Sequence, residues 1–496
     1  MKDNVIVIGA GIGGLSCAAL LSHGGHRVEV FEKNTYIGGA CSSYEKQGYI
    51  LDRSVHLFSL GLNGPFGKIL NRLGLNNLAF VKEINKRTSM KFYQTEGYYP
   101  SDFNVNSMIN AMKPSAKNGE RTEKGSENDV MARLKKTGIS NQTFKEMGKV
   151  MASILTIRKN KLAQLYEDGL TVTQYISQFS EDPFIHGLFA FLLAGMFAIS
   201  PKQASAGEFI HCFKTEMTTQ EGYQYPLGGG SQAVPNALAE GIKKYGGEIK
   251  INSRVDSIVI KNNKVQGVMV KNEMIKAPIV VSNLSIRMTV LNLVGRDYFD
   301  RNYLAKIESL KPSLSSMTFK LALKEPLIKE WGCVNLYHPT LDDWKGKYGP
   351  GAPKSNGFFG PIPSNIDPSL APKGGQVAIF GTIVPAKVTN WDKWQEVYYA
   401  DLKEFFPELE KKLNFMDLSF PKDFAHATGK PLGPVEGLAL TPDQTGKNKP
   451  SSVLPIEGLY VVGDTAGTDA HGIGTQLAAD SGIKCADMIL GITEKR

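Results

Sequence analysis

The 496-residue sequence has few features that assign it to a class of protein at first sight. Its five cysteines are odd in number and widely spaced, without a C-x-x-C pair, so no zinc ribbon, redox dithiol or disulfide framework is indicated. This cysteine usage is typical of a reduced, intracellular chain. The absence of G-x-S-x-G, H-E-x-x-H and Walker motifs disfavours hydrolase, metalloenzyme and NTPase hypotheses.

Long apolar runs are missing as well. The nearest, FIHGLFAFLLAGMFAI at 184–199, carries a histidine and two glycines and falls short of the ~18–20 apolar residues of a membrane span. Lys2 and the apolar run from Val5 to Leu21 imitate a secretion signal. Glycines at nucleotide-loop spacing interrupt that run, so we predict a folded segment rather than an export signal and expect a cytoplasmic protein.

The positive charge is not gathered into a basic stripe. The net charge is +9, and the densest basic stretch, 113–136, combines seven Lys/Arg with four Asp/Glu. Such a mixture is typical of a solvated loop or helix start. We therefore expect no nucleic-acid partner, and we favour attraction to anionic lipid and peripheral membrane contact instead.

Length and composition predict a globular protein of two domains. A single hydrophobic core usually stops growing at roughly 250–300 residues, and this chain is longer. With 42% hydrophobic and 21% charged residues, the composition is that of a folded protein.

The N-terminal segment NVIVIGAGIGGLSCAALLSHGGHRVEVFEK has the layout of a dinucleotide-binding unit. A predicted strand leads into Gly9, Gly11 and Gly14 at G-x-G-x-x-G spacing, and an alanine- and leucine-rich helix follows. The glycines permit a tight turn, close approach to a pyrophosphate and helix–strand packing, while the helix N-terminus attracts the anion. A second strand ends at Glu32, which is placed to accept both hydroxyls of an adenosine ribose. These features fit NAD and FAD equally.

The following segment, EKNTYIGGACSSYEKQGYILDRSVH, distinguishes the two cofactors by resemblance. It contains a Gly38-Gly39 pair, a hydroxyl-rich stretch and a terminal part that ends at His56. This arrangement resembles the extended FAD fingerprint of the flavin amine oxidase superfamily. The resemblance implies that the glycine pair lies against the pyrophosphate and flavin side. The sequence departs from the fingerprint at Leu51, where an aromatic residue is usual, and at Ser54, where a glycine is usual.

A second block, 222–270, resembles the phytoene desaturase and carotenoid isomerase group. The turn and helix from Tyr225 to Leu238 are similar to that group's Y-P-x-G-G turn and helix. The resemblance implies that the backbone of Val255 meets the adenine. On its residues alone, the block predicts a helix from about Gln232 to Tyr245 and then a hairpin that turns at Lys261 to Lys264.

A third block near the C-terminus, GLYVVGDTAGTDAHGIGTQLAADSG, resembles the second FAD signature of many flavoproteins. The resemblance implies that Asp464 accepts a hydrogen bond from a ribityl hydroxyl. A helix is predicted to start near Thr475, and its N-terminal amides and dipole would face the partial negative charge at flavin N1 and O2. Carotenoid desaturases usually have a proline–glycine run here, whereas this block has no proline.

FAD is therefore the expected cofactor, and no metal is expected. The expected FAD-binding residues are Gly9, Gly11, Gly13, Gly14, Glu32, Lys33, Gly38, Gly39, Ser42, Ser43, His56, Val255, Gly463, Asp464, Gly472, Ile473, Gly474 and Thr475. Asp469 and His471 are interpreted as turn and cap residues, with proton transfer near the flavin as the alternative.

The expected fold is α/β, with a discontinuous Rossmann-like FAD domain of the glutathione reductase type. Residues 1–85, 220–295 and 440–496 would form this domain, and the insertions 86–219 and 296–439 a mixed α+β substrate domain. Helix 184–199 would be buried, line an apolar pocket or dip into a membrane. All four tryptophans lie in the second insertion, in a core or in a substrate tunnel.

The resemblance implies an FAD-dependent oxidoreductase similar to phytoene desaturases, carotenoid isomerases and retinol saturases. Flavin N5 would exchange a hydride with a C–C or C=C bond of a large apolar, isoprenoid substrate, while the protein binds, orients and excludes water. An amine oxidase or protoporphyrinogen-oxidase-like enzyme is one alternative. A flavin-binding, membrane-associated protein without turnover is another. No catalytic residue is assigned at this stage.

Overall fold

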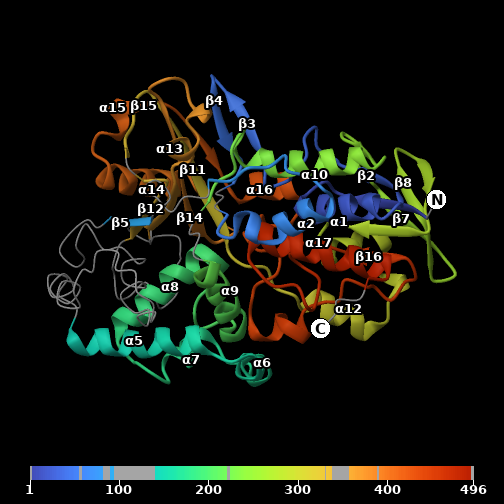
Figure 1. Ribbon diagram of the computed structural model, residues 1–496, viewed down its shortest axis with the longest axis horizontal. Coiled ribbons are helices and arrows are strands. Elements are labelled where there is room, and N and C mark those ends of the chain that lie inside the picture. Colours follow the sequence, from blue (N-terminus) through green and yellow to red (C-terminus); the bar gives the residue numbers. More distant parts are fainter. Residues whose placement is uncertain are drawn as a thin grey trace.

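The computed structural model describes residues 3–54, 58–81, 90–93, 140–219, 224–329, 331–337, 357–387 and 390–492. Within them the chain forms two large sheets with helices packed around them, one sheet on the right and one on the upper left of Figure 1. The two sheets differ in kind, since one is parallel and the other is largely antiparallel.

The parallel sheet has the strand order β16-β10-β1-β2-β6. Its strands are β1 Asn4–Ile8, β2 Arg27–Phe31, β6 Glu248–Lys250, β10 Ile279–Ser282 and β16 Leu459–Val461. All four pairings are parallel. The strands come from the three separate segments that were expected to build the FAD domain, and the α/β class is confirmed. The domain boundaries stay a prediction.

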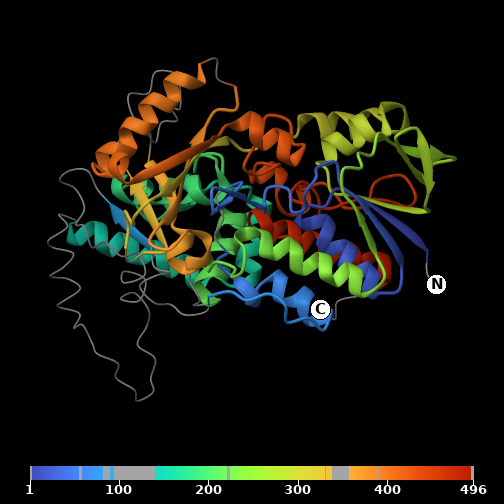
Figure 2. The same ribbon diagram turned by 90° about the horizontal axis from the view of Figure 1, so that it is seen from above.

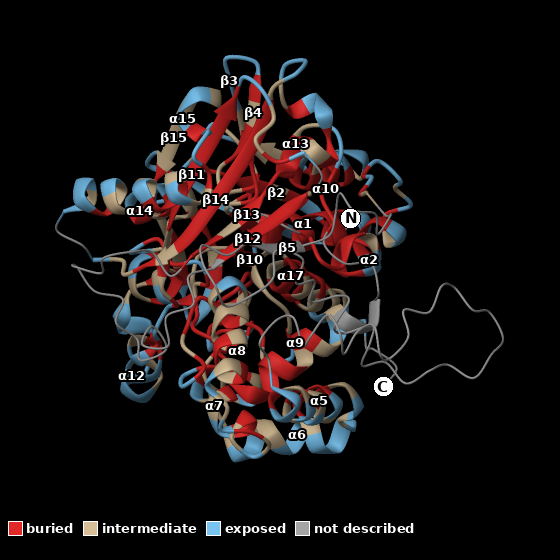
Figure 3. Cartoon of the chain, turned by 90° about the vertical axis from the view of Figure 1, so that its left-hand side faces the viewer, coloured by how far each residue is buried: buried red, intermediate tan, exposed pale blue. Residues whose placement is uncertain are grey.

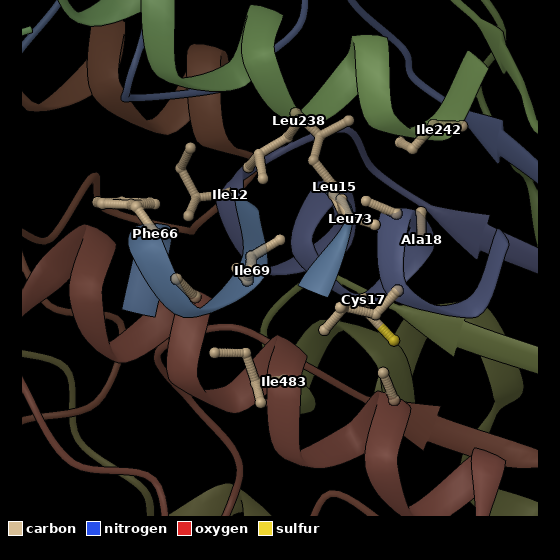
Figure 4. Packing of buried hydrophobic residues seen from close by; sticks show 14 of the residues in the cluster. Ile12, Leu15, Cys17, Ala18, Phe66, Ile69, Leu73, Leu238, Ile242 and Ile483 are labelled. Carbon is tan, nitrogen blue, oxygen red and sulfur yellow. The ribbon is translucent and has the colours of Figure 1, made fainter. Parts of the chain in front are cut away.

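A layer of helices covers one face of this sheet. The helices are α1 Ile12–His23, α2 Pro65–Arg72, α10 Ala233–Lys244 and α17 Gly474–Leu490. Figure 2 shows α1, α10 and α17 side by side in blue, green and red. In Figure 4, Leu238 and Ile242 of α10 lie on one side of α1 and Ile483 of α17 on the other. Helix α1 is apolar all round, which suits a helix that has neighbours on every side. It is buried along almost its whole length.

The alternation of side chains along β1 connects two hydrophobic cores. Val5 and Val7 join the core under α1, whereas Ile6 and Ile8 join a core on the opposite face. That second core is covered by β7 Ser257–Lys261, β8 Lys264–Val270, β9 Glu273–Lys276, α11 Ile286–Met288, the π-helical turn Thr289–Val294 and α12 Arg301–Ser309. The predicted hairpin is present and turns through Asn262 and Asn263, both with positive φ.

The second large sheet has the order β15-β11-β14-β13-β12-β5. Its strands are β5 Met90–Tyr93, β11 Ser315–Leu323, β12 Cys333–Tyr337, β13 Gly357–Pro361, β14 Gln376–Val384 and β15 Leu413–Ser419. One face packs against α14 Trp391–Phe405, and Figure 3 shows the buried strands in red. Trp331, Trp391 and Trp394 belong to this core, while Trp344 lies outside the described residues.

A helical cap packs below this sheet in Figure 1. It contains α5 Asn141–Thr156, α6 Lys159–Asp168, α7 Val172–Ile176, α8 Pro183–Phe197 and α9 Ala206–Thr219. Ser140, Thr171 and Asp182 cap three of these helices by accepting backbone N–H groups. In the parts of the chain that the structure describes, no helix combines the length and apolar character needed to cross a bilayer.

Shorter elements complete the described chain. They are β3 Ser43–Lys46, β4 Tyr49–Asp52, α13 Pro363–Ile366, α15 Leu409–Lys412, α16 Pro421–Thr428 and the 3₁₀ turns Gly61–Asn63, Gly230–Gln232, Arg296–Tyr298, Pro368–Leu370, Pro442–Gln444 and Gly446–Asn448. The β3–β4 hairpin packs on the second sheet, where Tyr49 and Leu51 contact Val377 and Ile379.

Candidate functional site

A cavity of about 790 Å³ lies at the carboxyl ends of the parallel strands. Gly9 follows β1, Glu32 follows β2, Asn283 follows β10 and Asp464 comes after β16, and all four line the cavity. Ligands of open α/β sheets bind at this edge. The cavity continues to α8 and to the second sheet, so it spans both large parts of the molecule.

The glycine loop leaves no room for side chains between β1 and α1. A Cβ on Gly14 would lie 2.2 Å from the carbonyl oxygen of Gly9, and a Cβ on Gly11 would lie 2.5 Å from Nδ2 of Asn283. A Cβ on Gly13 would lie 2.9 Å from the backbone nitrogen of Gly463. Gly9 itself has a φ of +93°, which favours glycine. The bare backbone of this loop is therefore open to a phosphate group.

Glu32 is held in a fixed orientation by two backbone N–H groups. Ala10 donates to Oε2 at 2.7 Å, and Asn34 donates to Oε1 at 2.8 Å. The side chain is buried, and burial raises the pKa of the carboxyl although both N–H groups act in the opposite direction. A carboxylate accepts about four hydrogen bonds, so each oxygen retains capacity for a ribose hydroxyl.

The glycine pair is bonded to the glycine loop. Gly38 donates its N–H to the carbonyl of Ala10 at 2.7 Å, and both Gly38 and Gly39 have positive φ and line the cavity. Ser42 and Ser43 do not line it. Ser42 donates to the carbonyl of Gly39, whereas Ser43 donates to Asp52, so both support the loop from behind.

Some of the remaining predicted residues line the cavity, and others do not. Lys33, Val255, Ile473, Gly474 and Thr475 line the cavity, and Lys33 donates to the carbonyl of His426 in α16. Gly14, Gly463 and Gly472 are not lining residues. His56 lies outside the described residues. The assignment of these residues to FAD stays a prediction.

Asp464 carries a stabilised negative charge on the cavity wall. Its Oδ2 forms an ion pair with Lys430 and accepts the N–H of Gly437 at 2.7 Å. Burial opposes ionisation, but Lys430, Gly437 and Lys449 outweigh it and hold the pKa of Asp464 below its usual range. Oδ1 receives no hydrogen bond from the described residues. It is thus available as an acceptor, in keeping with the expected ribityl contact.

No motif in the sequence marks Glu436, whose side chain lies beside the first residue of α17 in the folded chain. Gly474 donates its N–H to Oε1 at 2.9 Å, while Oε2 is buried without a hydrogen-bond partner. Burial and the neighbouring charge of Asp464 raise the pKa of Glu436 to about 8. The surroundings of Glu436 therefore favour its protonated form, whose O–H is a hydrogen-bond donor.

A second carboxyl without a sequence signal, Glu216 of α9, lines the cavity farther along. Ser59 donates to its Oε1 at 2.7 Å, and Gln476 in the first turn of α17 donates to Ser59 at 2.9 Å. Burial raises the pKa of Glu216 to about 7. Acid and carboxylate forms of Glu216 therefore coexist near neutral pH, as a proton-transferring group requires.

The far part of the cavity is apolar. Phe191, Leu192 and Met196 of α8 face it, together with Phe359 and Ile383 of the second sheet. Of the three expectations for helix 184–199, the structure shows that α8 lines an apolar pocket.

His471 lies behind the cavity wall and not among its lining residues. Its Nδ1 is 3.0 Å from Oε2 of the buried Glu208, and its ring stacks on His211 with centroids 4.3 Å apart. Although burial acts against ionisation, the hydrogen bonds from His471 and Tyr166 and the charge of Lys449 help to lower the pKa of Glu208 to about 2. This network fixes the loop before α17, in line with the interpretation of His471 as a structural residue.

The fold and the cavity together define a dinucleotide-binding protein with an adjoining apolar chamber. The family model described as flavin containing amine oxidoreductase matches residues 12–490. The chain belongs to this family, its cofactor is FAD, and it is an FAD-dependent oxidoreductase. The resemblance to the flavin amine oxidase superfamily is confirmed.

Relatives match over nearly the whole chain. Prolycopene isomerase from Daucus carota is 25% identical over 533 residues, which cover 99% of this chain and 81% of the relative. All-trans-retinol 13,14-reductase from Rattus norvegicus is 23% identical, covering 99% and 86%. The solved structure of an oxidoreductase from Methanosarcina mazei superposes with a TM-score of 0.73 at 21% identity, covering 98% of this chain and 100% of that one. This structural likeness shows the fold alone.

The substitution Gly14→Ala tests the close approach of α1 to β1. The added Cβ would collide with the carbonyl of Gly9, and overpacking of this kind costs about 1–3 kcal/mol. We expect a loss of that size in urea denaturation and a loss of most bound FAD, measured by flavin absorbance. Gly148→Ala is the matched control, because its Cβ meets nothing within 4 Å. Full FAD retention in Gly14→Ala would contradict the tight packing.

The raised pKa of Glu216 predicts a pH-dependent stability. The pKa of the Glu216 carboxyl is about 4.5 in the unfolded chain and about 7 in the folded protein. The folded state therefore binds the proton more tightly, and stability falls as pH rises from 4.5 to 7. In Glu216→Gln this contribution disappears, so the drop in Tm between pH 5 and pH 7.5 should be smaller than in the parent protein. Identical pH profiles would refute the raised pKa.

Proposed function

We propose that this enzyme exchanges a hydride between FAD and a C–C or C=C bond of a large apolar, isoprenoid substrate. The observation that carries the proposal is the continuity of the cavity, which runs from the glycine loop and Asp464 to the apolar surface of α8 and the second sheet. The names of the relatives, prolycopene isomerase and all-trans-retinol 13,14-reductase, support an isoprenoid substrate. Contact with an anionic membrane surface stays a further prediction.

The residues present fit the cofactor. Bare glycine backbone would hold the pyrophosphate, Glu32 the ribose and Asp464 the ribityl chain, and Glu436 and the start of α17 would face the ring system. Bound FAD supplies a two-electron acceptor or donor. The chain's own task is to hold the apolar molecule, exclude water and manage the accompanying proton.

Glu216 is the residue we assign to that proton. It lines the cavity and is linked through Ser59 to Gln476 in the first turn of α17. In the direction of desaturation, one carbon of the substrate loses a hydride to the cofactor and its neighbour loses a proton to the Glu216 carboxylate. Saturation is the reverse, with the acid form of Glu216 as the donor. In both directions atoms and charge balance within a single turnover.

The substrate class is tested by anaerobic bleaching of the bound flavin. A saturated or partly saturated isoprenoid in detergent should reduce the flavin, or a conjugated isoprenoid should reoxidise chemically reduced protein, with loss or return of visible absorbance. Primary amines and a porphyrinogen serve as competing substrates. Reaction with amines alone would replace the proposal by an amine oxidase, and no reaction with any of them would favour a binding protein without turnover.

The role of Glu216 is tested by Glu216→Gln. General acid–base catalysis contributes about 10²–10⁴-fold to a rate, so single-turnover reaction should slow by about that factor and lose its dependence on pH near 7. FAD content should stay unchanged. Glu396→Gln on the exposed surface of α14 is the control. A Glu216→Gln enzyme with the parent rate and pH profile would remove Glu216 from the mechanism.

A further inference from the structure

The apolar part of the cavity contains one polar group whose environment is unusual. Asn335 of β12 lines the cavity and is 1% exposed, yet neither its Nδ2 nor its Oδ1 has a hydrogen-bond partner in the part of the chain that the structure describes. Nearly all buried side-chain polar atoms in proteins are paired, and an unpaired one costs stability. A completely unpaired amide on a cavity wall therefore points to a ligand group that pairs with it.

The sheet register directs this amide toward the cavity. The neighbours Val334 and Leu336 belong to the core under α14, and side chains alternate along a strand, so Asn335 faces the opposite side. There Asn335 stands across from Phe359, and Phe359 across from Gly381 in the next strand.

The Asn335 amide and the nucleotide-binding end of the cavity lie in different parts of the molecule. Figure 1 shows β12 on the left of the molecule, whereas the strands of the parallel sheet lie on the right. The other cavity residues that the second sheet supplies carry no charge in the described part of the chain. A carboxylate at this place would meet no cation and would leave Oδ1 of Asn335 without a donor.

We propose that Asn335 binds the hydroxyl group of a substrate that is otherwise apolar. A hydroxyl donates one hydrogen bond and accepts others, so it satisfies Oδ1 and Nδ2 together. A hydrocarbon satisfies neither atom, and a carbonyl satisfies only Nδ2. This inference rests on the proposed function, and it narrows the substrate class to an isoprenoid alcohol whose oxygen lies away from the flavin.

The test compares two ligands on the FAD-loaded protein: a C20 isoprenoid alcohol and the hydrocarbon with a methyl group in place of its CH₂OH. Binding is followed by the perturbation of the flavin spectrum. We expect the alcohol to bind at least about tenfold more tightly, the effect of one hydrogen bond of ordinary strength. In Asn335→Leu, which keeps the approximate volume, the preference should vanish or reverse. Equal binding of both ligands to the parent protein would overturn the proposal.

A second measurement uses no ligand and no turnover. Removing an unpaired buried amide relieves its cost, so Asn335→Leu should raise the Tm of the FAD-loaded protein. Asn365→Leu is the matched control, because the Asn365 amide donates to the carbonyls of Ile328 and Trp331 and its loss should lower Tm. An equal decrease in both variants would show that Asn335 is already paired in the free protein and would contradict the proposal.

The two proposals fail in different ways. If the alcohol binds with the stated preference but no isoprenoid exchanges electrons with the flavin, the proposed function is wrong and the binding site stands. If alcohol and hydrocarbon bind and react alike, the proposed function stands and the role of Asn335 is wrong.

Discussion

The close contact between α1 and the turn after β1 determines where every other part of the site lies. Gly14 packs so near to the carbonyl of Gly9 that not even a methyl group fits between them. The same contact brings the loops after β10 and β16 against the glycine loop, through Asn283 and Gly463. Segments far apart in the sequence thereby meet around one stretch of bare backbone. The carboxyl ends of their parallel strands form the nucleotide-binding end of the cavity.

Three carboxyls on the cavity wall show how the surroundings set protonation. Asp464 has Lys430 and a backbone N–H beside it, so it keeps its charge. Glu436 lies close to that charge, which favours its protonated form. Glu216 accepts a hydrogen bond from Ser59, and burial raises its pKa to about 7. One cavity thus contains three carboxyls whose surroundings favour different protonation states.

The sequence predicts those parts of the site that depend on local backbone geometry. The glycine loop, Glu32, the glycine pair and the start of α17 each lie within a short segment whose turn, strand or helix constrains residue type, and the structure brings most of them to one cavity. Glu216, Glu436 and Asn335 carry no such local constraint. Their properties arise from burial and from partners on other elements, as with Glu216, Ser59 and Gln476, so no motif marks them. The serines after the glycine pair, Ser42 and Ser43, do not line the cavity, and their assignment to FAD stays a prediction.

The order of the parallel sheet has a consequence for the synthesis of the protein. Its edge strand β16 and helix α17 come from the last part of the described chain, yet they pack against β10 and α1. During translation, α1 is made early with its neighbours β2 and α2, but its neighbour α17 is made several hundred residues later. Pairings of such long sequence separation form slowly. Until the segments of β16 and α17 have been made, the glycine loop lacks one wall, and the apolar surfaces of β10 and α1 that they cover stay exposed.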